Sequence, residues 1–101
     1  MTNITPQEAK KIMDTASDYC ILDVRSRDEY KERHIPGAYC LPLDEIPNEA
    51  EYELPDKSQL LLVYCRSGVR SKQAAALLDA MGYTNIKEFG GILDWPYETV
   101  K

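Results

Sequence analysis

Continuous apolar runs and amphipathic segments follow one another along the chain, and they predict strands and helices in turn. Cys20–Val24 and Leu60–Tyr64 are short and almost entirely apolar, which is typical of strands buried on both faces of a sheet. Tyr39–Leu41 predicts a brief strand, and Ile86–Phe89 predicts a further one. The second of these is closed by Gly90-Gly91.

Two helices are predicted by their first residues. Thr5–Glu8 and Ser26–Glu29 each place a hydroxyl residue three positions before a glutamate, the pattern of a capping box. Pro6 follows the first cap, and apolar residues then recur at helical spacing through Ala16. The second box opens a short helix that we expect to end near Arg33.

A third helix is predicted over Lys72–Met81 from its alanine and leucine content, with Gly82 as its C-terminal stop. Ile92–Glu98 predicts a final short helix. Between Pro42 and Ser58 the chain has three prolines and many acids. We interpret this segment as a surface connection with at most one helical turn and its acids as solvated.

The alternation of strands and helices predicts an α/β fold, with a parallel sheet of about five strands and helices on both faces. In such sheets ligands bind beyond the carboxyl ends of the strands. Cys65 lies at the end of the Leu60–Tyr64 strand, so it is expected at the edge where a site would form.

Length and charge narrow the classes of function. The 101 residues predict a single domain, and the net charge of −5 argues against a nucleic-acid or anionic-membrane partner. No apolar stretch approaches the ~20 residues that cross a bilayer. The first residues, Met1–Pro6, lack the basic and apolar regions of a secretory signal, so we expect a cytoplasmic location. The spacing of the three cysteines fits no zinc pattern, and no metal or cofactor is expected.

The segment Cys65–Ser71 carries the chemistry. It joins a buried strand to a helix, and backbone N–H groups at a helix N-terminus favour an anion. A thiolate at Cys65 is therefore expected to have a pKa below the ordinary value of about 8.5. Arg66 and Arg70 add positive charge in a chain that is acidic overall. The sequence predicts an ionised cysteine in a loop that holds anions.

The chain resembles a single-domain rhodanese-like sulfurtransferase over nearly its whole length. Three groups of residues carry the resemblance by their order and spacing: Asp23–Arg25 with Glu29-Tyr30 and His34–Ala38; Cys65–Ser71; and Gly82-Tyr83 with Phe89–Gly91 and Trp95. One departure is visible, because Arg33 stands where the family commonly has glycine.

The resemblance implies a reaction through a persulfide. Cys65 would take a sulfane sulfur from thiosulfate or another persulfide donor and pass it to a thiophilic acceptor, which is cyanide, a thiol or a protein thiol. The N–H groups of Arg66, Ser67, Gly68, Val69, Arg70 and Ser71 would cradle the terminal sulfur. Arg66 and Arg70 would hold the anionic donor and offset the charge of the leaving sulfite.

Two alternatives remain at this point. A cysteine-dependent phosphatase or arsenate reductase also uses a thiolate in an anion-binding loop, although its loop typically has five residues between cysteine and arginine. Here four residues separate Cys65 from Arg70. A persulfide carrier for a partner protein would use the same loop.

Four further residues could serve either chemistry or structure. Cys20 and Cys40 are interpreted as small core residues, with a resolving thiol as the alternative. Asp23 needs a partner inside its apolar strand; we favour backbone N–H groups or Arg25 over a role in steering the loop. His34 is interpreted as a structural residue of its turn, because a thiolate nucleophile needs no general base.

Overall fold

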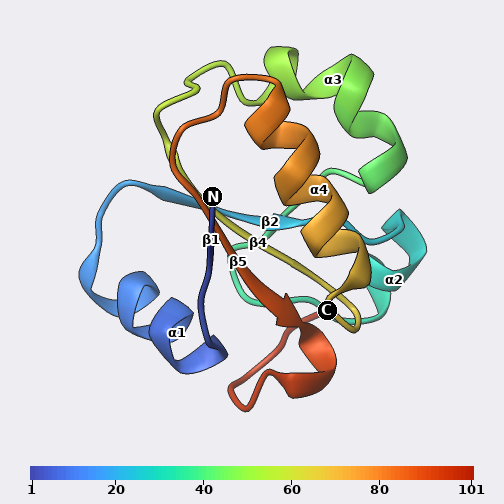
Figure 1. The fold of residues 1–101 in the computed structure, drawn as a ribbon. Coiled ribbons are helices and arrows are strands. Elements are labelled where there is room, and N and C mark those ends of the chain that lie inside the picture. The colour runs from blue at the N-terminus through green and yellow to red at the C-terminus, as the bar shows by residue number, and fades with distance from the viewer.

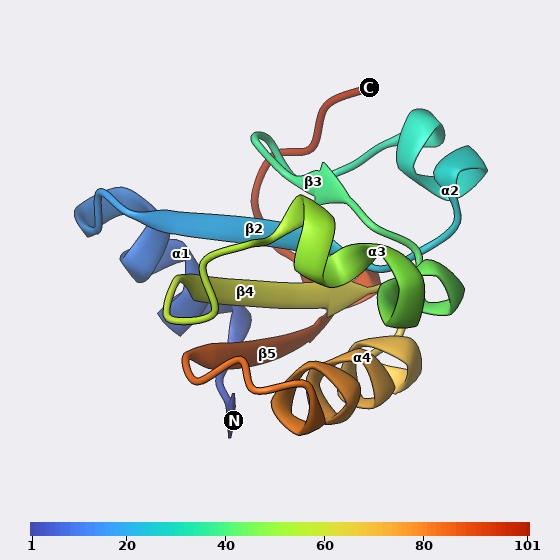
Figure 2. The same cartoon turned by 90° about the horizontal axis from the view of Figure 1, so that it is seen from above.

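The computed structural model describes residues 1–101 and contains one sheet of five parallel strands. The strands run in the order β1-β5-β4-β2-β3 (Figures 1 and 2). Their bounds are β1 Thr2–Asn3, β2 Tyr19–Asp23, β3 Tyr39–Cys40, β4 Leu60–Cys65 and β5 Ile86–Gly91. The predicted α/β class is confirmed.

Helices cover both faces of this sheet, as predicted. Helix α1 (Pro6–Thr15) packs on one face, while α3 (Ile46–Glu53) and α4 (Val69–Ala80) pack on the other (Figure 2). Helix α2 (Arg27–Glu32) follows β2. Two single 3-10 turns span Leu43–Glu45 and Ile92–Asp94.

The two core layers follow from the alternation of side chains along a strand. In β4, Leu61 and Val63 face the cluster under α3 and α4, whereas Leu62 and Tyr64 face the cluster under α1. All four side chains have no exposed surface. Because β4 lies in the middle of the sheet, its end is enclosed by elements from the whole chain.

Local sequence signals place the first two helices. The Thr5 hydroxyl accepts the Glu8 N–H at 3.0 Å while the Glu8 carboxylate accepts the Thr5 N–H at 2.9 Å. Ser26 and Glu29 form the same reciprocal pair at the start of α2. Both capping boxes are confirmed.

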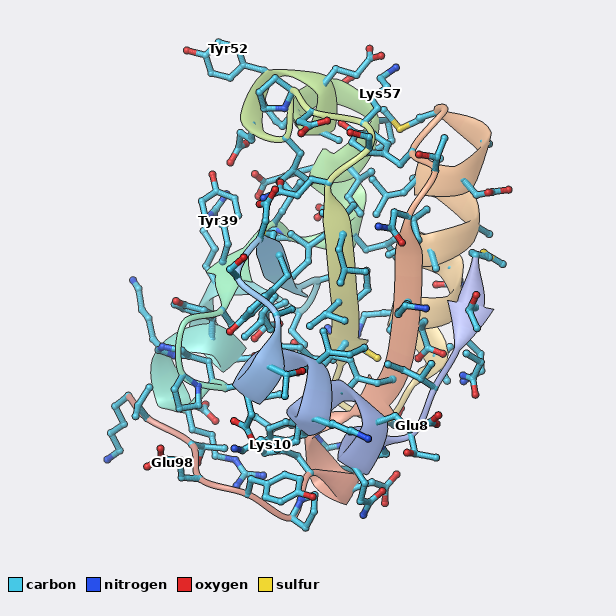
Figure 3. All side chains as sticks on the ribbon, turned by 90° about the vertical axis from the view of Figure 1, so that its left-hand side faces the viewer. Glu8, Lys10, Tyr39, Tyr52, Lys57 and Glu98 are labelled. Carbon is cyan, nitrogen blue, oxygen red and sulfur yellow. The ribbon has the colours of Figure 1, made fainter.

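The prediction for Pro42–Ser58 was wrong. This segment contains a 3-10 turn and the eight-residue helix α3, whose Ile46 and Ala50 are fully buried. Pro47 lies in the first turn of α3, where its missing N–H has no partner to lose. The outer face of α3 carries Tyr52, which is 85% exposed and projects away from the sheet (Figure 3).

Three other boundaries differ from the predictions. Helix α4 begins at Val69 rather than Lys72, so the end of the predicted loop is the first helical turn. Strand β5 continues through Gly90-Gly91, and the final helix is only the 3-10 turn Ile92–Asp94. Strand β1, which pairs with β5, was not predicted.

No helix in the structure combines the length and the apolar character that crossing a bilayer requires.

Candidate active site

Cys65 is the last residue of β4, and its side chain is 1% exposed. Its Sγ accepts a hydrogen bond from the backbone N–H of Gly68 at 3.0 Å. The Ser71 hydroxyl oxygen lies 3.4 Å from the same sulfur. The predicted arrangement of a cysteine inside a strand-loop-helix turn is therefore present.

Gly68 makes the turn around the sulfur possible. Its φ of +108° is left-handed, a conformation that other residues rarely adopt. Gly68 is the N-cap of α4, so the N–H groups of Val69, Arg70 and Ser71 belong to the first helical turn and have no partner within the helix. This turn places unpaired backbone N–H donors at the edge of the sheet where β4 ends with Cys65.

The remaining loop side chains point outward. Ser67 and Val69 are exposed, and so is Arg66. The Arg66 side chain lines a cavity of about 230 Å³ together with the arginines Arg25 and Arg33 and the acids Glu29 and Glu32. We call this space the arginine cavity. The Arg25 guanidinium is held by Asp23 and by the Arg33 carbonyl, so Arg33 and Arg66 are the two arginines of this cavity outside an ion pair. Arginine side chains at its wall suit a small anion.

Arg70 is not a free cation, contrary to what its position in the sequence suggested. Its guanidinium binds both carboxylate oxygens of Glu29, at 2.6 Å and 2.9 Å. The hydrogen bonds from Arg70 lower the pKa of Glu29 to about 2, and the same pair raises the pKa of Arg70. Glu29 was predicted as the second half of a capping box and as part of the family resemblance, but not as a partner of Arg70; it serves both the cap and Arg70.

Asp23 is held by the structural partners that the sequence favoured. Its carboxylate accepts the Arg25 backbone N–H at 3.0 Å and the Arg25 Nη2 at 2.7 Å, both buried. It also accepts the Tyr64 hydroxyl at 2.6 Å. Burial is the main cause that raises the pKa of Tyr64, and the adjacent Asp23 charge adds to it. This network braces the ends of β2 and β4 beside Cys65.

The turn after α2 is fixed by backbone contacts and by one aromatic stack. The His34 ring stacks on Tyr30 with centroids 3.8 Å apart, and its backbone pairs with Val100. These contacts agree with the structural role predicted for His34. Arg33 has a φ of −171°, which is extended backbone open to any residue, so the departure from glycine brings no strain.

Glu88 is a residue of the site that the sequence did not indicate. It is 3% exposed and accepts the Ser71 hydroxyl at 2.6 Å, behind Cys65. Glu88 also accepts the Gly90 N–H at 2.7 Å and the Asn3 side-chain amide at 2.5 Å. No local pattern links these residues, because they come from β5, α4 and the edge strand β1.

No three side chains of His, Cys, Asp or Glu meet in an arrangement suited to a metal ion. The polar groups around Cys65 are backbone N–H donors, a serine and charged side chains already paired within the protein. The arrangement is therefore a buried thiol whose sulfur accepts a backbone N–H at the start of a helix, beside further unpaired backbone donors.

Comparison with known proteins gives the family. A model of the rhodanese-like domain matches residues 5–97. The thiosulfate sulfurtransferase PspE of Escherichia coli is 38% identical over 80 residues, which are 79% of this chain and 77% of that protein. A sulfurtransferase of Allochromatium vinosum is also 38% identical, over 86% of this chain and 79% of its own length. The chain thus belongs to the rhodanese-like sulfurtransferase family.

Two solved structures and one further relative are also similar to this chain. The rhodanese-like domain of the Anabaena Alr3790 protein has a TM-score of 0.90 at 28% identity and covers 99% of this chain and 79% of its own. An E. coli rhodanese whose structure contains anions has a TM-score of 0.76 at 36% identity, over 82% of this chain and 98% of its own. A putative sulfur carrier protein of Bacillus subtilis, YrkF, is 34% identical over 95% of this chain, which spans about half of its length.

Proposed function

We propose that this protein is a sulfurtransferase of the thiosulfate type that works through a persulfide on Cys65. The observation that carries the proposal is the Gly68 N–H donated to Cys65 Sγ at 3.0 Å at the start of α4. A donor aimed at the sulfur stabilises its anion, and the anion is the nucleophile. The named thiosulfate sulfurtransferase among the relatives supports the choice of donor.

The reaction has two displacements. The Cys65 thiolate attacks the outer sulfur of thiosulfate, the S–S bond of the donor breaks, and sulfite leaves with the bonding electron pair. An acceptor nucleophile, cyanide or a thiol, then attacks the terminal sulfur of the persulfide and releases the Cys65 thiolate. Two half-reactions through one covalent intermediate predict ping-pong kinetics.

The surroundings supply charge compensation. The N–H groups from Arg66 to Ser71 are proposed to cradle the terminal sulfur, as amide groups converging on one point bind anions. The arginine cavity next to the loop is proposed to take the sulfonate end of the donor and the leaving sulfite. Arg70 contributes to this field through a guanidinium that Glu29 already holds.

The phosphatase or arsenate-reductase alternative has less support. Four residues separate Cys65 from Arg70, and both terminal nitrogens of Arg70 are bound to Glu29 rather than directed at an incoming oxyanion. The carrier alternative shares the Cys65 persulfide and differs only in the acceptor, which would be a partner protein. The location in the cytoplasm, the acceptor and the donor used in the cell stay predictions.

Mass spectrometry after exposure to thiosulfate tests the proposal. We expect one added sulfur atom on the peptide that contains Cys65, and its removal by cyanide. In Cys65→Ser both the adduct and the transfer of sulfur to cyanide should disappear while the circular dichroism spectrum stays unchanged. Persisting turnover in Cys65→Ser rejects the role of Cys65, and hydrolysis of a chromogenic phosphate ester in place of an adduct favours the phosphatase alternative.

A further inference from the structure

Arg33 lines the arginine cavity and has no separate role in the proposed reaction. Its backbone is held in place, because its carbonyl accepts Arg25 Nη2 at 2.7 Å and the next residue, His34, pairs with Val100. The backbone of Arg33 is extended, and successive side chains of an extended segment point in opposite directions. The Arg33 side chain is therefore directed away from the stack of His34 on Tyr30 and toward the cavity.

The charges that line the arginine cavity do not cancel. The charges of Arg25 and Glu29 are each compensated by an ion pair with a residue outside the lining. The charged residues of the lining that form no ion pair in the structure are Glu32, Arg33 and Arg66. Two positive charges and one negative charge leave the cavity with a net charge of +1, and removal of Arg33 alone would leave it at zero. Arg33 therefore decides the sign of the charge in this cavity.

The cavity lies beside the segment that contains the nucleophile. Arg66 follows Cys65 directly, and the Arg66 carbonyl accepts the Leu93 N–H at 3.2 Å. Arg66 and Leu93 both line the cavity, and so does Glu29, the partner of Arg70. Under the proposed function, the outer sulfur of the donor meets Cys65 and the leaving group occupies this cavity. The charge of the cavity then acts on the leaving group.

Donors of sulfane sulfur differ in the charge of that leaving group. When the Cys65 thiolate attacks the outer sulfur of thiosulfate, the S–S bond of the donor breaks and a Cys65 persulfide forms. Sulfite leaves with the electron pair and carries a double negative charge. An organic thiosulfonate reacts in the same way, but its sulfinate leaves with a single charge, as does the thiolate of an organic persulfide. Electrostatic attraction is proportional to charge, so a positive cavity favours the departure of sulfite most.

We propose that Arg33 is a specificity-determining residue that shifts the choice of donor toward inorganic thiosulfate and away from thiosulfonates and organic persulfides. The Arg33 guanidinium makes a cavity of balanced charge positive, which stabilises a doubly charged leaving group more than a singly charged one. This inference rests on the proposed sulfur transfer through Cys65, and it adds the class of donor.

The preference between two donors tests this role. Thiosulfate and methanethiosulfonate form the same Cys65 persulfide, and in both cases cyanide removes the sulfur as thiocyanate. In a ping-pong reaction kcat/KM for the donor reports the first half-reaction alone, so the acceptor step does not enter the comparison. We define the donor preference as kcat/KM for thiosulfate divided by kcat/KM for methanethiosulfonate.

We expect Arg33→Gln to lower kcat/KM about threefold for methanethiosulfonate and about tenfold for thiosulfate, because the electrostatic free energy doubles for a dianion. The donor preference then falls about threefold. Arg33→Lys keeps the charge and should keep the preference. Lys31→Gln is the matched control: it removes an equal charge from an exposed residue of α2 outside the cavity, and the preference should not change.

Salt provides a second measurement that a purely structural role of Arg33 would not affect. Exposed charges are screened as the ionic strength rises, and the Arg33 side chain is exposed. Potassium chloride should therefore lower the donor preference of the wild-type protein toward that of Arg33→Gln. A wild-type preference that does not respond to salt would contradict the electrostatic role.

The outcomes separate this inference from the proposed function. An unchanged donor preference in Arg33→Gln, or an equal loss in Lys31→Gln, overturns the role of Arg33 and leaves the Cys65 persulfide intact as a proposal. A loss in Arg33→Lys as large as that in Arg33→Gln assigns the effect to shape rather than charge and also overturns the inference. If neither donor adds sulfur to Cys65 in the wild-type protein, sulfur transfer itself is rejected, and the role of Arg33 with it.

Discussion

Arg70 and Glu29 form one ion pair. The loop therefore faces the combined charge of the pair rather than the full positive charge of Arg70. Glu29 Oε1 and Oε2 accept from the two terminal nitrogens of Arg70 in a parallel geometry, which is the strong form of such a pair. Neither side chain is fully buried, with 35% of Arg70 and 26% of Glu29 exposed. A change at one partner therefore alters both the position and the charge of the other.

Stability should depend on pH through this pair. The pKa of Glu29 in the folded protein is about 2, against an ordinary value of 4.5. Because the folded value is the lower one, the stabilisation is present above about pH 4.5 and is lost as the pH falls toward about 2. We expect Glu29→Gln, which keeps a capping side chain, to cost about 1–2 kcal/mol at neutral pH in urea unfolding.

The same comparison of wild type with Glu29→Gln at acidic pH can contradict this prediction. Near the folded pKa of Glu29, wild type and Glu29→Gln should converge in their free energies of unfolding. Glu51→Gln removes an exposed partner of Lys57 and should change little at any pH. A Glu29→Gln deficit that stays constant down to pH 2 would assign its cost to something other than the ion pair.

The Arg70–Glu29 pair also predicts how Arg70 affects the binding of the sulfur donor thiosulfate. In Arg70→Ala, Glu29 is left as an unpaired anion near the arginine cavity, which it lines, so the KM for thiosulfate should rise about tenfold or more. Glu29→Gln in the same protein should recover part of that loss, since it removes the repulsion. Steady-state kinetics of the two single variants and the double variant measure the coupling; equal KM values for Arg70→Ala and the double variant would contradict it.

Among the elements, β5 shapes the loop through a close approach at Gly91. An added Cβ at this position would meet the Arg66 carbonyl oxygen and lie 2.6 Å from the Ser67 nitrogen, so the loop must move. The backbone of Gly91 is ordinary, with φ −129°. Contact with the loop, and not conformational freedom, therefore requires glycine here.

We expect Gly91→Ala to lower the rate of sulfur transfer about a hundredfold, because a displacement of about 1 Å in a reacting group has an effect of that size. Ile86→Val, at the other end of β5, is the matched control: it should cost about 1 kcal/mol of stability and leave the loop in place. Urea unfolding measures the stability of each variant. The rate of sulfur transfer to cyanide is then compared under conditions where both variants are folded. Equal activities in the two variants would show that the approach at Gly91 does not position the loop.

The elements that the sequence predicted are those with a local cause. The capping boxes of α1 and α2 lie within four residues, and the apolar runs of β2 and β4 are continuous. Helix α3 also had a local signal, since Ile46, Ala50 and Leu54 recur every four residues. The prolines and acids between them outweighed that signal in our interpretation, although Pro47 in a first turn is compatible with a helix.

The rest of the site has no local cause. Arg70 and Glu29 are 41 positions apart, Ser71 and Glu88 are 17 apart, and Asn3 and Glu88 are 85 apart. These pairs form only once α2, β1 and β5 are placed beside the loop. The candidate nucleophile Cys65 and the backbone N–H groups of its loop were predictable because one short segment contains them. The pairing of Glu29 with Arg70 and of Glu88 with Ser71 was not.

For the molecule as a whole, the order of the strands separates the three cysteines. Residues of β2 and β4 pair in parallel, with Asp23 beside Tyr64. Cys20 therefore lies four residues before the level of Cys65, about 13 Å along the sheet at ~3.3 Å per residue. Cys40 pairs with Asp23 from the far side of β2, which places it two strand spacings, or about 10 Å, from β4. A disulfide needs Cα atoms within about 7 Å.

This separation predicts that Cys65 has no resolving partner within the chain. Burial raises the pKa of both the Cys20 and the Cys40 thiol, so neither supplies a thiolate readily. After treatment with hydrogen peroxide, we expect Cys65 to carry sulfenic or higher acids and the protein to contain no internal disulfide by non-reducing mass spectrometry. During the same peroxide treatment, Cys20→Ser and Cys40→Ser should be inactivated as fast as the wild-type protein. Protection in either variant would mean that the sheet opens far enough for the two thiols to meet, and the alternative of a resolving cysteine would replace the structural interpretation.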